Sequence, residues 1–113
     1  MRNSIATALA LSLSVSGAHA ATRTTYLTGN TLYAACTPII GEATGYVLGV
    51  VDTQAQAEAQ GLTPLFPLCI PQGVTGSQLA DVTCVYLRDH PSMRHQSASL
   101  ITVIAIATAF PCQ

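Results

Sequence analysis

Apolar residues recur three or four positions apart over residues 28–40, a spacing that predicts a helix. Thr28 stands just before the first apolar positions and suits the N-cap, because its hydroxyl can accept a hydrogen bond from a free backbone N–H. Pro38 and Gly41 interrupt the pattern. We therefore expect this first helix to be short or kinked.

A second helical pattern begins near Glu42 and ends in a polar, alanine-rich tail over residues 53–60, after which Gly61 can terminate the helix. Gly45 and Gly49 lie four positions apart, on a different face of this helix from its apolar stripe. Such small residues predict the close approach of a neighbouring helix. The apolar stripe of the second helix consists of Tyr46, Val47, Val50 and Val51.

Residues 62–74, which we term the proline loop, contain three prolines and a glycine. Proline removes a backbone donor and restricts the residue before it, so regular structure is not expected here. Cys69 lies in the middle of the loop, where a disulfide would replace the missing hydrogen bonds.

The clearest helix start follows the proline loop. Thr75 and Gln78 fit a capping box, in which each side chain accepts a hydrogen bond from the backbone N–H of the other residue. Val74 and Leu79 stand at the two positions of a hydrophobic staple. One face of the resulting third helix carries Leu79, Val82, Thr83 and Tyr86.

His90 and Pro91 are expected to end the third helix and open the fourth, with Pro91 at position N1. The run from Pro91 to Phe110 is nearly all apolar from Ala98 onward. Its β-branched residues would suit a strand, but it exceeds the roughly 4–8 residues of a buried strand. We predict a central core helix, and overall an all-α fold: a small compact bundle of about four helices with a proline-rich loop, stapled by disulfides.

The N-terminal residues 1–20 have the pattern of a cleavable signal peptide. Arg2 precedes an apolar run, and Ala18-His19-Ala20 is a small-residue cleavage site. The run is shorter than the roughly 20 residues that span a bilayer, so a membrane helix is the weaker interpretation. We expect cleavage after Ala20, a periplasmic location, and a single domain over residues 21–113.

Charge is scarce: half of the residues are hydrophobic and 8% are charged, against about 25% charged in ordinary soluble domains. Residues 21–113 contain no lysine and carry a net charge of −2, from three arginines and five acidic residues. Without a basic patch the chain suits neither nucleic-acid phosphates nor an anionic membrane surface, so we expect neither partner.

Few residues offer catalytic chemistry. His90 and His95 lie near Asp89, but a spacing of five does not place two metal ligands on one helix face. The cysteine spacings contain neither a zinc knuckle nor a C-x-x-C redox pair, and no serine has a nucleophile-elbow context. We therefore expect no catalytic site, no metal and no cofactor, and hence not an enzyme.

Five segments along the chain form a recognisable series: TGNTLYAAC (28–36), GYVLGVVD (45–52), LCIPQGVTGSQLADV (68–82), YLRDHP (86–91) and ATAFPC (107–112). In this order they resemble the Rap/Tai family, the periplasmic immunity proteins of type VI secretion systems. The resemblance covers about residues 28–112, and the order of the segments together with the terminal Phe-Pro-Cys makes it fairly specific.

The resemblance implies an all-helical, disulfide-bonded domain, often a homodimer, that binds and inhibits a peptidoglycan amidase toxin. The chain departs from the family pattern at Thr44, where a cysteine commonly stands, and Cys84 is an additional cysteine. The alternative hypothesis is a periplasmic chaperone-like or general protein-binding module with no toxin partner. Candidate partner contacts are Glu42, Thr44, Arg88, Asp89, Arg94 and His95.

Four cysteines in a small exported chain point to two disulfides, for which three pairings exist. We place Cys69–Cys112 first, because it would fix an irregular loop and a chain end that would otherwise fray. Cys36–Cys84 is then the second pair. The alternative for this second pair is two buried free thiols, which pack as small hydrophobic residues.

Overall fold

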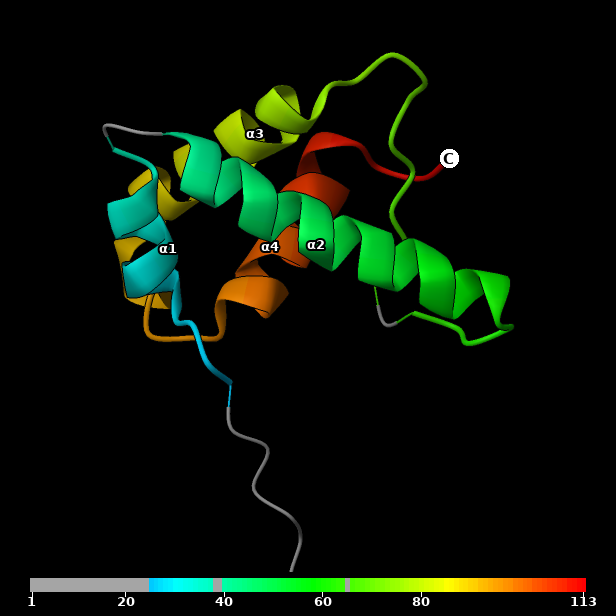
Figure 1. Ribbon diagram of the computed structural model, residues 1–113, viewed down its shortest axis with the longest axis horizontal. Coiled ribbons are helices and arrows are strands. Elements are labelled where there is room, and N and C mark those ends of the chain that lie inside the picture. The colour runs from blue at the N-terminus through cyan, green and yellow to red at the C-terminus, as the bar shows by residue number, and fades with distance from the viewer. Residues whose placement is uncertain (1–24, 38–39, 65) are drawn as a thin grey trace, which may run out of the picture.

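The computed structural model describes residues 25–37, 40–64 and 66–113 (Figure 1). This part of the chain is all-α, as predicted, and no strand occurs in it apart from one isolated bridge between Thr28 and Ser97. The predicted signal peptide, residues 1–20, and Pro38 lie outside the described residues. The elements are α1 (Gly29–Ala35), α2 (Ile40–Ala59), α3 (Gly76–Asp89), the short 3₁₀ helix η1 (Pro91–Met93) and α4 (Ala98–Ala109).

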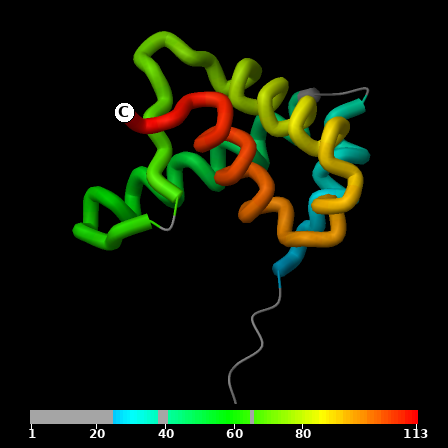
Figure 2. The backbone as a smooth tube through the Cα atoms, turned by 180° about the vertical axis from the view of Figure 1, so that it is seen from behind, coloured from blue at the N-terminus to red at the C-terminus, as the bar shows by residue number. Residues whose placement is uncertain are grey.

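The helices pack in two layers, with α1 at one end; α2 crosses in front of α3 and α4 in Figure 1 and lies behind them in Figure 2. The C-terminal half of α2 extends past α3 and α4 before the chain turns back at Gly61, whose φ is +78°. A positive φ is accessible to glycine at little cost, so Gly61 terminates the helix as predicted. The described residues of the proline loop then lead to α3 without forming a helix.

The hydrophobic core forms where the four α-helices meet. One cluster joins α1, α2, α3 and α4, and a second joins α2, α3 and α4. Thr83 and Thr102 are buried among them, and their hydroxyls donate to the carbonyls four residues earlier at 3.0 and 2.8 Å. The first cluster is Leu32, Ala43, Leu87, Ala98 and Ile101, and the second is Val47, Leu79 and Ile106.

The fourth helix starts later than predicted. The sequence suggested a helix from Pro91, whereas Pro91 opens only the three-residue η1, and α4 begins at Ala98 with Ser97 as its N-cap. Its hydroxyl accepts a hydrogen bond from the Leu100 N–H at 3.3 Å.

The reason for this break lies in the N-terminal segment, which pairs with residues 94–98. The Gly29 N–H donates to the Gln96 carbonyl and the Asn30 N–H to the Arg94 carbonyl, both at 2.8 Å. The Ala98 N–H in turn donates to the Leu27 carbonyl at 2.9 Å. Backbone groups that a continuous helix would have paired internally therefore pair with a segment about 65 residues away in sequence.

Gly29 makes the close approach that permits this pairing. A Cβ at this position would lie 2.9 Å from the Arg94 Cα and in contact with the Ile101 side chain. We expect Gly29→Ala to lower the free energy of unfolding by about 1–3 kcal/mol through overpacking, as measured by chemical denaturation. The matched control is Gly45→Ala, where nothing apart from the local backbone of the same helix lies within 4 Å of the new Cβ. Equal stability of the two variants would contradict this packing.

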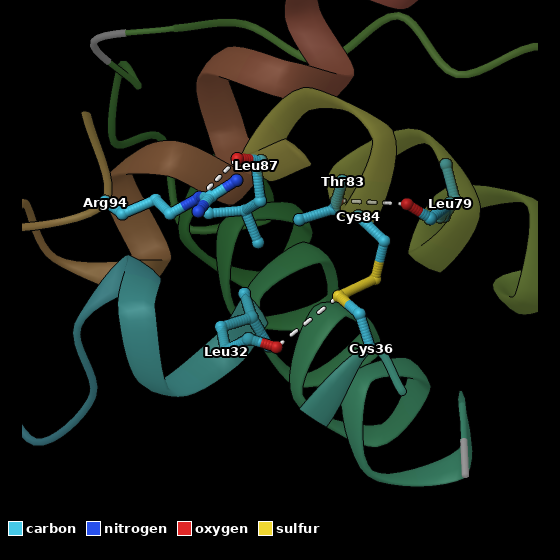
Figure 3. The surroundings of a disulfide bond; sticks show 7 residues. All are labelled: Leu32, Cys36, Leu79, Thr83, Cys84, Leu87 and Arg94. Carbon is cyan, nitrogen blue, oxygen red and sulfur yellow. Dashed lines mark hydrogen bonds between the residues drawn. A yellow bond between two sulfur atoms is a disulfide. The ribbon is translucent and has the colours of Figure 1, made fainter. Parts of the chain in front are cut away.

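Two disulfides link the elements. Cys36, the C-cap of α1, is bonded to Cys84 of α3, beside the buried Leu32 and Leu87 (Figure 3). The second bond joins Cys69 in the proline loop to Cys112 beyond the end of α4. The described residues contain no free cysteine.

Candidate partner-binding groove

An open groove of about 840 Å³ lies between α2 and the first half of α4, bordered at one side by the proline loop. We term this feature the apolar groove. Its lining contains no acidic, basic or histidine side chain, so the surface it offers is electrically neutral. The lining residues are Gly45, Tyr46, Gly49, Val50, Thr53, Gln54, Ala57, Pro64, Phe66, Ser99, Leu100 and Val103.

The floor of the apolar groove on α2 is shaped by its two glycines. Gly45 and Gly49 are both exposed, and the space where a Cβ would stand is empty to 4 Å at each. The prediction that a neighbouring helix of the same chain packs on these glycines is therefore wrong. The glycines instead leave the backbone of α2 accessible from the groove.

The opposite side of the groove comes from α4. This helix is buried along Ala98, Ile101, Ala105 and Ile106, whereas Leu100 and Val103 are only half-buried and line the groove. The all-round apolar sequence of α4 thus serves both the core and this surface.

A side-chain hydrogen bond holds the proline loop against α2. The Gln54 amide Nε2 donates to the carbonyl of Phe66 at 2.6 Å. Phe66 and Pro64 are half-buried and complete the groove wall.

Tyr46 and Ser99 both supply hydroxyls to the groove. Burial raises the pKa of the Tyr46 phenol, and the nearby Ser99 hydroxyl offsets part of that increase. Because folding raises the pKa of this phenol, the group contributes to stability below its unfolded pKa. This contribution is lost as the pH rises through the folded pKa. Because its pKa lies above the ordinary value of tyrosine, the phenol is neutral at physiological pH, and the groove remains uncharged.

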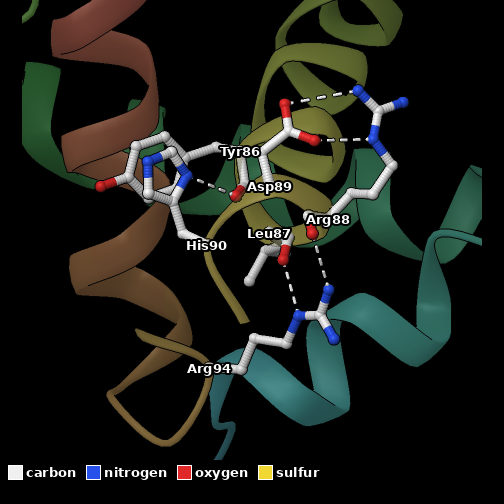
Figure 4. A network of polar contacts seen from close by, with 6 residues as sticks. All are labelled: Tyr86, Leu87, Arg88, Asp89, His90 and Arg94. Carbon is white, nitrogen blue, oxygen red and sulfur yellow. Dashed lines mark hydrogen bonds and ion pairs between the residues drawn. The ribbon is translucent and has the colours of Figure 1, made fainter. Parts of the chain in front are cut away.

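A polar network surrounds the C-terminal end of α3 (Figure 4). The Arg94 Nε donates to the Leu87 carbonyl at 2.6 Å, and its Nη2 donates to the Arg88 carbonyl at 3.0 Å. The guanidinium also lies 3.8 Å above the centre of the Tyr33 ring. Arg94 therefore satisfies carbonyls that the end of a helix leaves free, and joins α3 to α1.

The other charged residues of this network are exposed. Arg88 and Asp89 form an ion pair at 2.8 Å, and the Arg88 guanidinium lowers the pKa of the Asp89 carboxyl. The His90 ring stacks on Tyr86 at 3.9 Å, with its Nδ1 2.9 Å from the Tyr86 carbonyl.

Replacing Arg94 tests this bracing role. We expect Arg94→Met, which keeps the apolar stem, to lower the free energy of unfolding by about 2–3 kcal/mol because two charged hydrogen bonds to carbonyls are lost. Urea denaturation measures the effect. The control Arg88→Met removes an exposed ion pair and should leave stability close to that of the unmodified protein. A similar loss in both variants would show that the carbonyl contacts of Arg94 stabilise the fold no more than the exposed ion pair of Arg88 does.

The predicted contact residues fall in separate places. Glu42 is exposed in the first turn of α2, and Thr44 is half-buried one residue before the groove lining begins. Of the four predicted contact residues near the end of α3, Arg94 is half-buried, whereas Arg88, Asp89 and His95 are exposed.

The histidines hold different partners. His95 contacts the Gln96 amide through its Nε2, whereas His90 is stacked on Tyr86. Among the described residues, no group of three or more histidine, cysteine or acidic side chains could hold a metal ion. No helix in this part of the chain is both long and apolar enough to cross a membrane.

Sequence reasoning did not find the apolar groove. Two signals pointed toward it: small residues every four positions along α2, from Gly45 through Gly49 and Thr53 to Ala57, and more apolar surface on α4 than one core face requires. The first was read as an internal helix contact and the second as complete burial.

The fold and groove together define a small, doubly disulfide-bonded helical domain with an open, neutral apolar surface of the kind that binds other proteins. Residues 28–112 match the family model of the Rap1a immunity proteins, and the chain belongs to this family. The match confirms the resemblance seen in the sequence. No curated protein and no solved structure matches the chain at a significant level.

Proposed function

We propose that this protein is a periplasmic immunity protein that binds and inhibits a peptidoglycan amidase toxin of a type VI secretion system. The family match over residues 28–112 carries the proposal. The protein acts by binding and has no catalytic activity of its own. Export depends on residues 1–20, with cleavage after Ala20.

Two physical features support this role. An inhibitor that occludes a catalytic cleft needs a rigid scaffold, and the two disulfides restrain both the α1–α3 contact and the proline loop. The bonds also suit an oxidising compartment such as the periplasm.

We assign the apolar groove as the main toxin contact, because burial of apolar surface provides most of the energy of protein association. Glu42 and Thr44 lie in the first turns of α2, just before the residues that line the groove, and supply polar contacts at its edge. The exposed Arg88, Asp89 and His95 form a second, polar candidate surface. Arg94 contributes to that surface by holding the turn in place.

Co-expression tests the function. The full chain is expressed in the periplasm together with an amidase encoded beside its gene, and cell lysis and complex formation are followed. Protection from lysis with recovery of a complex is expected. Lysis without a complex would refute the toxin assignment. Suppression of aggregation of unfolded clients without any effect on the amidase would instead favour the chaperone-like alternative.

A further inference from the structure

The two disulfides differ in their surroundings. Cys36 and Cys84 are half-buried and packed against the core cluster that contains Leu32 and Leu87 (Figure 3). Cys69 and Cys112 are both exposed, in segments without helix. Thiol–disulfide exchange requires an attacking thiolate to reach a sulfur atom, so the exposed bond is expected to react faster than the half-buried one.

The exposed bond fixes a segment that has few other ties. Backbone hydrogen bonds of the described loop residues lie at its two ends, from the Leu62 N–H to the Ala57 carbonyl and from the Val74 N–H to the Pro71 carbonyl. Between these ends, the Gln54–Phe66 hydrogen bond and the packing of Leu68 and Ile70 hold the loop.

We propose that Cys69–Cys112 is a reducible latch on the wall of the apolar groove, and that a dithiol opens it while Cys36–Cys84 stays intact. One thiolate of the dithiol attacks a sulfur of the bond and forms a mixed disulfide, and the second thiol displaces the remaining cysteine. The protein gains two electrons and two protons as two thiols, and the dithiol becomes a disulfide. The inference concerns the groove itself and is independent of which protein binds there.

Opening the latch affects the groove through the proline loop. Pro64 and Phe66 form the groove wall, and the loop that carries them is tied at Cys69 to the end of α4. After reduction, the contacts that hold the described middle part of the loop are the packing of Leu68 and Ile70 and the hydrogen bond from Gln54 to Phe66. The wall then becomes mobile, whereas the core around α1 and α3 keeps its own disulfide.

Differential alkylation tests the selectivity. The folded full chain is treated with dithiothreitol at neutral pH, sampled over time, alkylated and mapped by mass spectrometry. Cys69 and Cys112 should become alkylated at least about tenfold faster than Cys36 and Cys84. Equal rates, or earlier modification of Cys36 and Cys84, would overturn the proposal.

Limited proteolysis tests the effect on the groove wall. The double variant Cys69→Ser/Cys112→Ser should be cleaved by a nonspecific protease within residues 66–74 at least about tenfold faster than the oxidised protein, with unchanged cleavage in α1 and α3. Dithiothreitol should raise cleavage within 66–74 in the unmodified protein and have no further effect there in the variant. Unchanged loop cleavage in the variant would show that the bond does not hold the wall.

Discussion

We expect Gly49→Trp to weaken binding of the cognate amidase at least about 100-fold, because the indole fills the apolar groove that we assign as the main contact. Gly49 is exposed, and apart from the local backbone of its own helix nothing lies within 4 Å of the position of its Cβ, so a side chain can be added there without displacing a neighbouring element. Replacing a glycine inside a helix also removes an intrinsic cost to stability. Isothermal titration calorimetry with the purified amidase measures the affinity, and circular dichroism verifies the fold.

The matched control is Gln56→Trp, which places the same side chain on an exposed position of α2 outside the groove lining. This control should bind like the unmodified protein. Equal binding by Gly49→Trp and the control would show that the groove is not the contact surface. Substitution of the exposed Arg88, Asp89 and His95 would then test the second candidate surface.

Removal of the inner disulfide should have the largest effect on stability. The double variant Cys36→Ala/Cys84→Ala opens a bond between residues 48 positions apart, and the chain-entropy model gives a loss of about 4 kcal/mol. In a domain of this size that loss corresponds to a decrease in Tm of about 20 °C. Differential scanning calorimetry measures the change.

Peptide mapping under non-reducing conditions is the control for this experiment, because it shows that the variant retains Cys69–Cys112. A loss of stability below about 1 kcal/mol would contradict the assigned role of the inner bond. It would favour the view that residues 36 and 84 act mainly as small packed side chains.

Local signals predicted the helix starts well, because the interactions that define them span only three residues. Thr28 caps α1 by accepting a hydrogen bond from the Thr31 N–H at 3.4 Å. Thr75 and Gln78 form both bonds of the predicted capping box, at 2.7 and 3.2 Å. The proline loop is irregular for an equally local reason, since proline cannot donate a backbone hydrogen bond.

Features that depend on distant partners were not predictable in the same way. The helix α4 begins at Ala98 and not at the predicted Pro91, because Leu27 and Gly29 form backbone hydrogen bonds with residues 98 and 96. The role of Arg94 likewise depends on its approach to the end of α3.

The apolar groove shows why a pattern can be recognised and still be misread. Gly45 and Gly49 would look the same in sequence whether a helix packed on them or solvent reached them. Only the arrangement of α2 against α4 distinguishes the two cases. The pairs Cys69–Cys112 and Cys36–Cys84, which the sequence analysis placed first and second, are those present in the structure.

Titration of a purified cognate amidase with the purified, oxidised protein tests the central claim most directly. Hydrolysis of peptidoglycan fragments is followed as the protein is added. Our account predicts that the activity declines in proportion to the protein added and ends at a fixed stoichiometry, with Gly49→Trp unable to reproduce the decline. Full amidase activity in the presence of excess protein would contradict the account.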